Sequence, residues 1–248
     1  MVIPPDTPLW MVALATAFSV IIAKEAFGGT GMNIVNPALM ARAFLFFAYP
    51  SAMSGDKVWI AGQPDAFSGA TPLGSLIAGD ELPSIWTMVW GGMAGSVGET
   101  SKIAILLGAV LLVITGIASW RIMASVIIGG LSMGLLFNAI GSTPLMQIPC
   151  YYHLLMGGFL FGAVFMATDP VTAAQTNKGK IIYGLLIGII AVLIRVINNA
   201  YSEGMMLAIL LMNLFAPLID HYVIEGNIKR RKRRAMATKA SSTERTSL

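Results

Sequence analysis

Eighteen uncharged residues separate Lys102 from Arg121 in the stretch KIAILLGAVLLVITGIASWR (102–121). A helix that crosses the hydrocarbon core of a bilayer needs about 20 mostly apolar residues, so this stretch predicts a membrane span. The whole chain of 248 residues agrees, since 56% of it is hydrophobic and only 11% is charged. Soluble domains carry about 25% charged residues. The composition therefore excludes an ordinary soluble globule, and its high hydrophobicity also excludes a disordered chain.

The chain downstream of this stretch predicts four more spans. From Ile122 to Thr168 a further 47 residues carry no charge, and the Gly- and Pro-containing turn at 141–149 divides them into two helices. Two more apolar runs follow before the basic C-terminal segment. The expected helices lie near 122–140, 150–168, 181–200 and 204–224.

The chain upstream is less regular. Residues 9–26 predict one span, whereas Ala38 to Tyr49 is short and Leu82 to Gly98 contains one proline and several glycines. Such segments are typical of half-helices that enter the bilayer and turn back, although Leu82 to Gly98 could instead span fully. The predicted fold class is all-α, a polytopic membrane protein with about six transmembrane helices plus short or re-entrant half-helices.

Two similar tripeptides hint at an internal repeat. Asn36-Pro37-Ala38 and Asp169-Pro170-Val171 both place an Asx residue before a proline at the start of an expected helix. The repeat could be an inverted one, as in many transporters. Chance also supplies such pairs, because Asx is a good N-cap and proline a good first helical residue.

Charge divides the chain into a transmembrane domain, 1–228, and a basic tail, 229–248. The domain holds 8 basic and 11 acidic side chains, whereas the tail holds 8 basic and 1 acidic. The positive-inside rule places the tail, which we expect to be disordered, in the cytoplasm, and it places Glu99 and the loop before it on the outer side. Anionic lipid is the expected contact of the run 229–234, and nucleic acid is not expected as a partner.

The most polar part of the domain is the loop 51–81, which contains the string Ser68-Gly69-Ala70-Thr71. Small residues around a hydroxyl are what an enzyme that modifies this hydroxyl needs. On spacing alone the string is as well explained by a Ser/Thr turn that caps a helix beginning at Pro72.

Several stretches together resemble one family, the B subunits of the bacterial sodium-translocating NADH:quinone oxidoreductase. The matches run through nearly the whole chain. They are GGTGMNIVNP (28–37), AFLFFAYP (43–50), SGDKVW (54–59), FSGATPL (67–73), FMATDPV (165–171) and EGMMLAILLMNLFAPLIDHYV (203–223).

The resemblance implies a cofactor and its attachment residue. In this family FMN is joined through its phosphate to the threonine of the Ser-Gly-Ala-Thr motif, here Thr71, and Ser68, Gly69 and Ala70 complete the motif. It further implies electron transfer toward a second flavin (riboflavin) and ubiquinone, coupled to Na⁺ export from the bacterial inner membrane. Partners would be the other subunits and a flavin transferase, and the chain would not be active alone. No residue of the chain is assigned as catalytic and none as a metal ligand.

Family members are longer at the N-terminus, so this chain looks like the C-terminal portion of the subunit. We therefore assign no residues to the quinone or riboflavin site. Two alternatives stay open. One is the D subunit of the related Rnf ferredoxin:NAD oxidoreductase complex, which shares the flavin-threonine loop. The other is a channel or transporter without redox function, suggested by the broken helices.

Two acidic residues are candidates for the ion pathway. Asp220 lies near the cytoplasmic end of the last expected span, where a carboxylate is either a ligand for a small cation or a simple helix terminus. Asp169 precedes Pro170, where it serves either as an N-cap or as an ion ligand. Arg195 is expected to pair with Glu203.

Other polar residues carry weaker signals. Lys24, Glu25 and Arg42 could approach the flavin, because cations favour a phosphate and a reduced, anionic ring. His153 and His221 are too far apart in sequence for a local metal motif, and His153 is expected to be packed. The lone Cys150 excludes an intramolecular disulfide.

Overall fold

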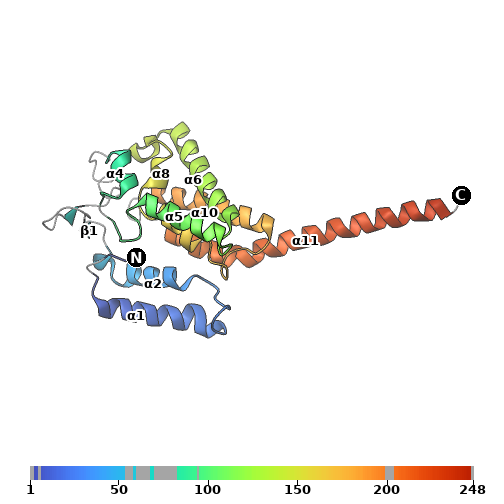
Figure 1. The fold of residues 1–248 in the computed structure, drawn as a ribbon, viewed down its shortest axis with the longest axis horizontal. Coiled ribbons are helices and arrows are strands. Elements are labelled where there is room, and N and C mark those ends of the chain that lie inside the picture. The colour runs from blue at the N-terminus through green and yellow to red at the C-terminus, as the bar shows by residue number, and fades with distance from the viewer. Residues whose placement is uncertain are drawn as a thin grey trace.

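The computed structural model describes residues 3–4, 7–53, 58–59, 68–69, 83–93, 95–198 and 204–246. Three long helices lie side by side and form the centre of the molecule (Figure 1). They are α6 (Trp120–Ile140), α10 (Asn177–Ile197) and α11 (Gly204–Thr246). The Thr176 hydroxyl accepts the first free amide of α10, from Gly179, and α6 ends at Gly141 with φ of 60°.

Helices α6 and α10 run parallel and approach each other through glycines. Gly188 lies against the backbone of Val126 and Gly130, and Gly129 lies against the carbonyl of Leu185. Small residues are the usual means by which membrane helices pack closely, because no hydrophobic effect drives them together in lipid. Helix α11 runs antiparallel to α10, and Gly204 faces the carbonyl of Ala191.

The N-terminal part forms a separate pair of helices. Helix α1 (Leu9–Ser19) continues as a π-helical turn, η1 (Val20–Lys24), and a 3-10 turn, η2 (Glu25–Phe27). It packs on α2 (Pro37–Ala48), where the rings of Phe18 and Phe44 stack with centroids 4.6 Å apart. A 3-10 turn, η3 (Pro50–Ala52), follows α2.

Short elements fill the middle of the chain. Two two-residue strands, β1 (Val58–Trp59) and β2 (Ser68–Gly69), pair antiparallel. Helix α4 (Ile85–Trp90) precedes α5 (Lys102–Ile114). Four short pieces follow α6, namely α7 (Pro144–Gln147), α8 (Tyr152–Leu155), α9 (Phe159–Phe161) and the π-helical turn η4 (Gly162–Met166).

The all-α polytopic fold class is confirmed, and four helices are long and apolar enough to cross a membrane. They are Leu9–Phe27, Trp120–Ile140, Asn177–Ile197 and Gly204–Met236. The predicted single helix at 150–168 is wrong, because the chain breaks at Gly157, whose φ is 59°. The predicted span 102–121 stops at Ile114, shortly before Gly116 with φ of 71°. Positive φ favours glycine and ends a helix.

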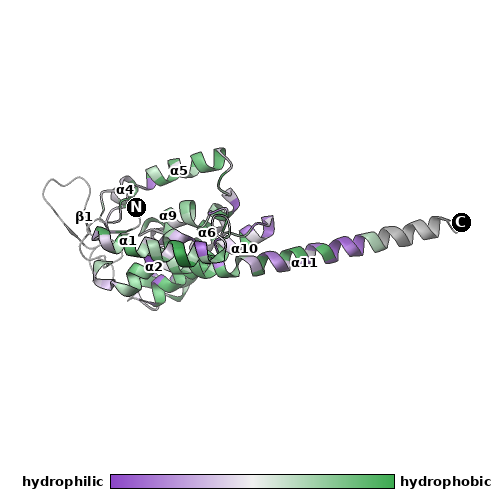
Figure 2. Cartoon of the chain, turned by 90° about the horizontal axis from the view of Figure 1, so that it is seen from below, coloured by the Kyte–Doolittle hydropathy of each residue, from purple (hydrophilic) through white to green (hydrophobic). Residues whose placement is uncertain are grey.

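Two other expectations differ from the structure. A full span over 82–98 is wrong, because the described part of this segment holds only the six-residue helix α4, which ends at Gly91 with φ of 95°. The expectation of a disordered tail is also not met, since α11 continues through the basic run to Thr246. After Gly226 the tail contains neither glycine nor proline, and Lys, Arg, Ala and Met all favour a helix. Figure 2 shows hydrophobic residues over the bundle and hydrophilic ones gathered on the projecting part of α11.

The bundle has two distinguishable ends. At the end that we call the tail end, α6 and α10 begin, and the Arg121 guanidinium contacts the side chain of Asn177 at 3.0 Å. Helix α11 projects beyond this end (Figure 1). At the loop end, α6 and α10 finish, α5 begins, and α4 packs beside them.

Candidate functional site

Most of the predicted cofactor loop lies outside the described residues. Ala70 and Thr71 are among those not described, and of the motif only the backbone of Ser68 and Gly69 is placed. This backbone forms β2, in which Gly69 lies opposite Val58. The flanks of the loop are described. On one side Tyr49 meets Trp10 edge to face, with ring centroids 5.8 Å apart, and on the other side α4 follows.

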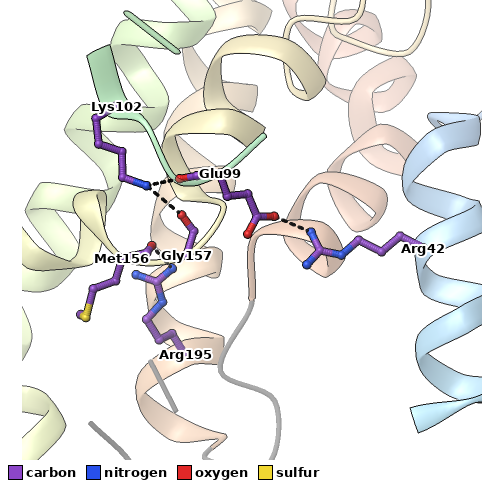
Figure 3. A network of polar contacts seen from close by, with 6 residues as sticks. All are labelled: Arg42, Glu99, Lys102, Met156, Gly157 and Arg195. Atoms are coloured by element: carbon purple, nitrogen blue, oxygen red, sulfur yellow. Dashed lines mark hydrogen bonds and ion pairs between the residues drawn. The ribbon is translucent and has the colours of Figure 1, made fainter. Parts of the chain in front are cut away.

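The largest group of buried charges in the described part of the chain lies at the loop end, around the break between α8 and α9 (Figure 3). Non-helical backbone at membrane depth needs partners inside the protein, because lipid supplies none. Lys102, which is 1% exposed, sends its ammonium to the carbonyl oxygens of Glu99 (2.5 Å) and Gly157 (3.4 Å). The first residue of α5 thus holds the chain at the break.

Arg195 reaches the same break from α10. Its Nη1 donates to the carbonyl oxygen of His153 at 2.5 Å, and its Nη2 donates to that of Met156 at 3.2 Å. The last carbonyls of a helix have no partner within it and carry partial negative charge. A guanidinium with several donors in fixed geometry satisfies two of them at once. Together with Lys102, it places two cations at the end of α8.

The other side of the break receives an anion. Gly158 begins the half-helix 159–166, and a Cβ atom there would lie 2.6 Å from Oε1 of Glu99, so the Glu99 carboxylate sits against this helix start. The Glu99 carboxylate accepts a hydrogen bond from Nη1 of Arg42 at 3.0 Å. The two side chains are 4% and 11% exposed. An anion at a helix start and cations at a helix end both match the helix dipoles.

Arg42, Glu99 and Arg195 also line a small cavity with Gly158 and apolar residues of α2, α9, η4 and α11. Its volume is about 10 Å³, which is room for roughly one water molecule. A larger apolar groove of about 530 Å³ lies between η1 and α11 and suits an apolar molecule. The network thus joins five parts of the chain without leaving space for a large ligand.

Sequence reasoning found some of these residues and missed their arrangement. We expected Arg42 near a flavin, and it binds Glu99 instead. Glu203 lies outside the described residues, so its pairing with Arg195 stays a prediction. The available signal was the position of Arg42 within an apolar helix, because a buried charge needs a partner. His153 is packed as expected, and its ring nitrogens have no hydrogen-bond partner within the described part of the chain.

The two Asx-Pro tripeptides lie side by side. Asn36 caps α2, since its Oδ1 accepts from the amides of Ala38 (3.0 Å) and Leu39 (3.3 Å). Its Nδ2 lies 3.5 Å from the Asp169 carboxylate. That carboxylate also accepts from the amide of Val171 and the hydroxyl of Thr172, both at 3.1 Å. The N-cap interpretation of Asp169 therefore has structural support.

Asp220 joins α11 to the start of α10. Its carboxylate accepts from the amides of Gln175 (2.6 Å) and Thr176 (3.0 Å) and from the Thr176 hydroxyl (2.5 Å). Gly179 leaves the space that this carboxylate fills. Both carboxylate oxygens thus serve the helix start, where a negative charge is stabilised. Among the residues that the structure describes, no three His, Cys, Asp or Glu side chains gather as a metal ion would require.

An all-α chain with four helices able to cross a bilayer, and with its buried charges matched to a broken helix, is a polytopic membrane protein. The chain belongs to the NQR2, RnfD, RnfE family, whose sequence model matches residues 1–229. This finding confirms the family resemblance predicted from the sequence motifs.

Similar proteins carry one name, the B subunit of Na(+)-translocating NADH-quinone reductase. The chain is 56% identical over 238 residues to the protein of this name from Pseudomonas paraeruginosa, covering 92% of this chain and 58% of that protein. It is 52% identical to the one from Chromohalobacter salexigens, covering 99% and 61%. For that of Klebsiella pneumoniae strain 342 the values are 53%, 94% and 59%. The chain thus spans about three fifths of the length of these relatives.

Proposed function

We propose that the chain is a membrane electron-transfer subunit of a sodium-pumping NADH:quinone oxidoreductase. The observation that carries this proposal is the 52–56% identity to proteins named as the B subunit of Na(+)-translocating NADH-quinone reductase. The same name favours this complex over the Rnf complex, although the RnfD protein falls in the same family. The partners of the chain would be the other subunits, ubiquinone and Na⁺.

We propose Thr71 as the attachment point of FMN. A threonine hydroxyl can form an ester with the flavin phosphate, and Gly69 lets the backbone approach both the flavin and a flavin transferase. Bound FMN would supply the redox chemistry, and the protein would supply position and electrostatics. The described flanks fit a tether, because both ends of the loop are fixed, one at the Trp10–Tyr49 contact and one at α4. Riboflavin is a further proposed cofactor, without assigned residues.

Replacing Thr71 by alanine is expected to abolish covalent flavin. The hydroxyl is the only group at this position that could be esterified, so no phosphoester can form without it. The chain is expressed with its partner subunits and a flavin transferase, and flavin fluorescence is read at its mass in a denaturing gel. Wild-type fluorescence that disappears in Thr71→Ala is the expected result.

Two controls accompany this experiment. Thr71→Ser retains a hydroxyl and should retain part of the fluorescence, whereas Ser68→Ala should leave Thr71 available. Fluorescence that persists in Thr71→Ala would place the flavin elsewhere. A wild-type chain without fluorescence, despite confirmed expression and active transferase, would favour a channel or transporter without redox function.

We propose that the tail end faces the cytoplasm of a bacterial inner membrane and that the loop 51–81 faces outward. Supporting this orientation, Lys178 and Lys180 lie at the start of α10, Arg121 lies at the start of α6, and the basic run 229–234 extends from the same end. Basic residues collect on the cytoplasmic side of membrane proteins.

Asp220 and Asp169 remain our candidates for the Na⁺ pathway, and Asp220 permits a direct test. Asp220→Asn should lower the free energy of unfolding by about 2 kcal/mol, because an amide cannot replace a carboxylate that accepts three hydrogen bonds. Thermal unfolding of the purified protein in detergent measures this loss. The Na⁺ concentration for half-maximal quinone reduction by the complex decides the second role. A rise supports the pathway, whereas an unchanged value leaves Asp220 with the helix connection alone.

A further inference from the structure

Helix α4 has two contrasting faces. On the inner face, Met88 is fully buried and packs in one cluster with Met93, Ile148 and Met156. On the outer face, Trp86 and Trp90 are 74% and 70% exposed. These two tryptophans are four residues apart, so they project from the same side of the helix. One side of α4 is thus fixed to the protein, and the other presents two indole rings.

The helix is held firmly in this orientation. The Ser84 hydroxyl accepts from the amide of Thr87 at 3.3 Å, and α4 ends at Gly91 in the left-handed conformation. A Cβ atom at Gly91 would lie 3.0 Å from the backbone of Ser101, so the end of α4 touches the N-cap of α5. The tryptophans therefore sit at a defined level, where α5 begins.

That level can be compared with the opposite end of the bundle. Trp120 is 59% exposed and begins α6 at the tail end, where the Arg121 guanidinium lies 5.5 Å from its ring centre. From there, α6 runs 21 residues to Ile140, which lies a few residues before Ile148 in the cluster under α4. A helix of this length rises about 30 Å, which is the thickness of the hydrocarbon core. The two tryptophan levels are thus separated by about one hydrocarbon thickness.

We propose that the outer face of α4, formed by Ile85, Trp86 and Trp90, binds the boundary between lipid headgroups and hydrocarbon at the loop end. An indole ring combines a large apolar body with one N–H donor, and tryptophan is enriched at this boundary. The sequence of α4, IWTMVW, contains no charge that would favour an acidic or basic protein partner. The face also continues the lipid-exposed surface of a protein that already resides in the bilayer.

This contact has a consequence for the loop 51–81, which directly precedes α4 in the sequence. By fixing α4 at the boundary, the tryptophans hold the C-terminal end of the loop at the membrane surface. The inference concerns α4 itself and does not depend on flavin attachment.

Depth-dependent quenching of tryptophan fluorescence tests the proposal. The full chain, in complex with its partner subunits, is reconstituted in phosphatidylcholine vesicles whose acyl chains carry bromine either near the ester or near the methyl end. The emission of Trp86 and Trp90 is obtained as the difference between wild type and the Trp86→Phe and Trp90→Phe variants. We expect a greater loss of this emission with the shallow bromine than with the deep one.

A matched control fixes the scale. Ile128, 57% exposed near the middle of α6, is replaced by tryptophan, and the added emission should be lost mainly with the deep bromine. Three results would overturn the proposal. Stronger deep quenching would place α4 inside the hydrocarbon, quenching by aqueous iodide alone would place it in water, and protection from both quenchers would mean that a protein partner covers the face. Phenylalanine is a conservative replacement, and the flavin content and assembly of each variant are checked before its emission is measured.

Discussion

Replacing Glu99 by glutamine is expected to lower the free energy of unfolding by about 3–5 kcal/mol. Such a loss is typical when one partner of a buried ion pair is removed. The Glu99 carboxylate lies 3.0 Å from the Arg42 guanidinium, and both side chains are nearly inaccessible to solvent. Its charge also faces the start of the half-helix 159–166. Unfolding of the purified protein in detergent, followed by tryptophan fluorescence, measures the loss.

A double variant separates the pair from other contacts of each residue. Arg42→Met alone should also destabilise, whereas Arg42→Met with Glu99→Met should recover part of the loss, because no charge then lacks its partner at this position. The exposed pair Glu225–Lys229, at 2.8 Å, offers a control, and Lys229→Gln should change stability by less than about 0.5 kcal/mol. A Glu99→Gln variant as stable as the wild type would show that the pair is not what holds the break.

Replacing Gly188 by alanine is expected to separate α6 from α10. A Cβ atom there would collide with the carbonyl of Val126 and lie 2.6 Å from the amide nitrogen of Gly130, and backbone cannot move aside as a side-chain tip can. Overpacking of this kind costs typically 1–3 kcal/mol, and we expect a value of about 3 kcal/mol here. The melting temperature of the purified protein reports the effect, and a larger residue at the same position should prevent accumulation of folded protein.

Gly226 provides the matched control. It also lies in a long helix, but a Cβ atom there would meet nothing within 4 Å. Gly226→Ala should therefore leave stability unchanged or raise it slightly, because alanine favours a helix by roughly 1 kcal/mol over glycine. Equal melting temperatures for Gly188→Ala and Gly226→Ala would contradict the close α6–α10 contact.

The long spans were predictable because a continuous apolar run has few alternatives in a bilayer. The helices at 122–140 and 181–200 were expected within a few residues of α6 and α10. Where glycines interrupt an apolar run, hydropathy alone could not tell a span from a broken segment. The run 150–168 is apolar throughout, yet it breaks at Gly157 because distant cations satisfy the carbonyls released there.

The polar residues of the site were predictable singly but not in their pairing. Asp220 and Asp169 were identified as unusual, and the structure supplies the backbone amides that both accept. Nothing local in the sequence connects Arg42 with Glu99, since 57 residues separate them. Such contacts depend on how helices associate, which a pattern along a single helix does not contain. Thr71 was predicted from a motif and stays a prediction.

The network at the broken segment also bears on how the protein comes together. Its bonds join residues that are 57, 55 and 42 positions apart in the chain. The long helices can enter the membrane on their own hydropathy, whereas 152–166 can leave its helix at Gly157 only once α5 and α10 have brought Lys102 and Arg195 to it. We therefore expect an order of assembly in which this segment settles last, so that its final shape reports that its neighbours are already in place.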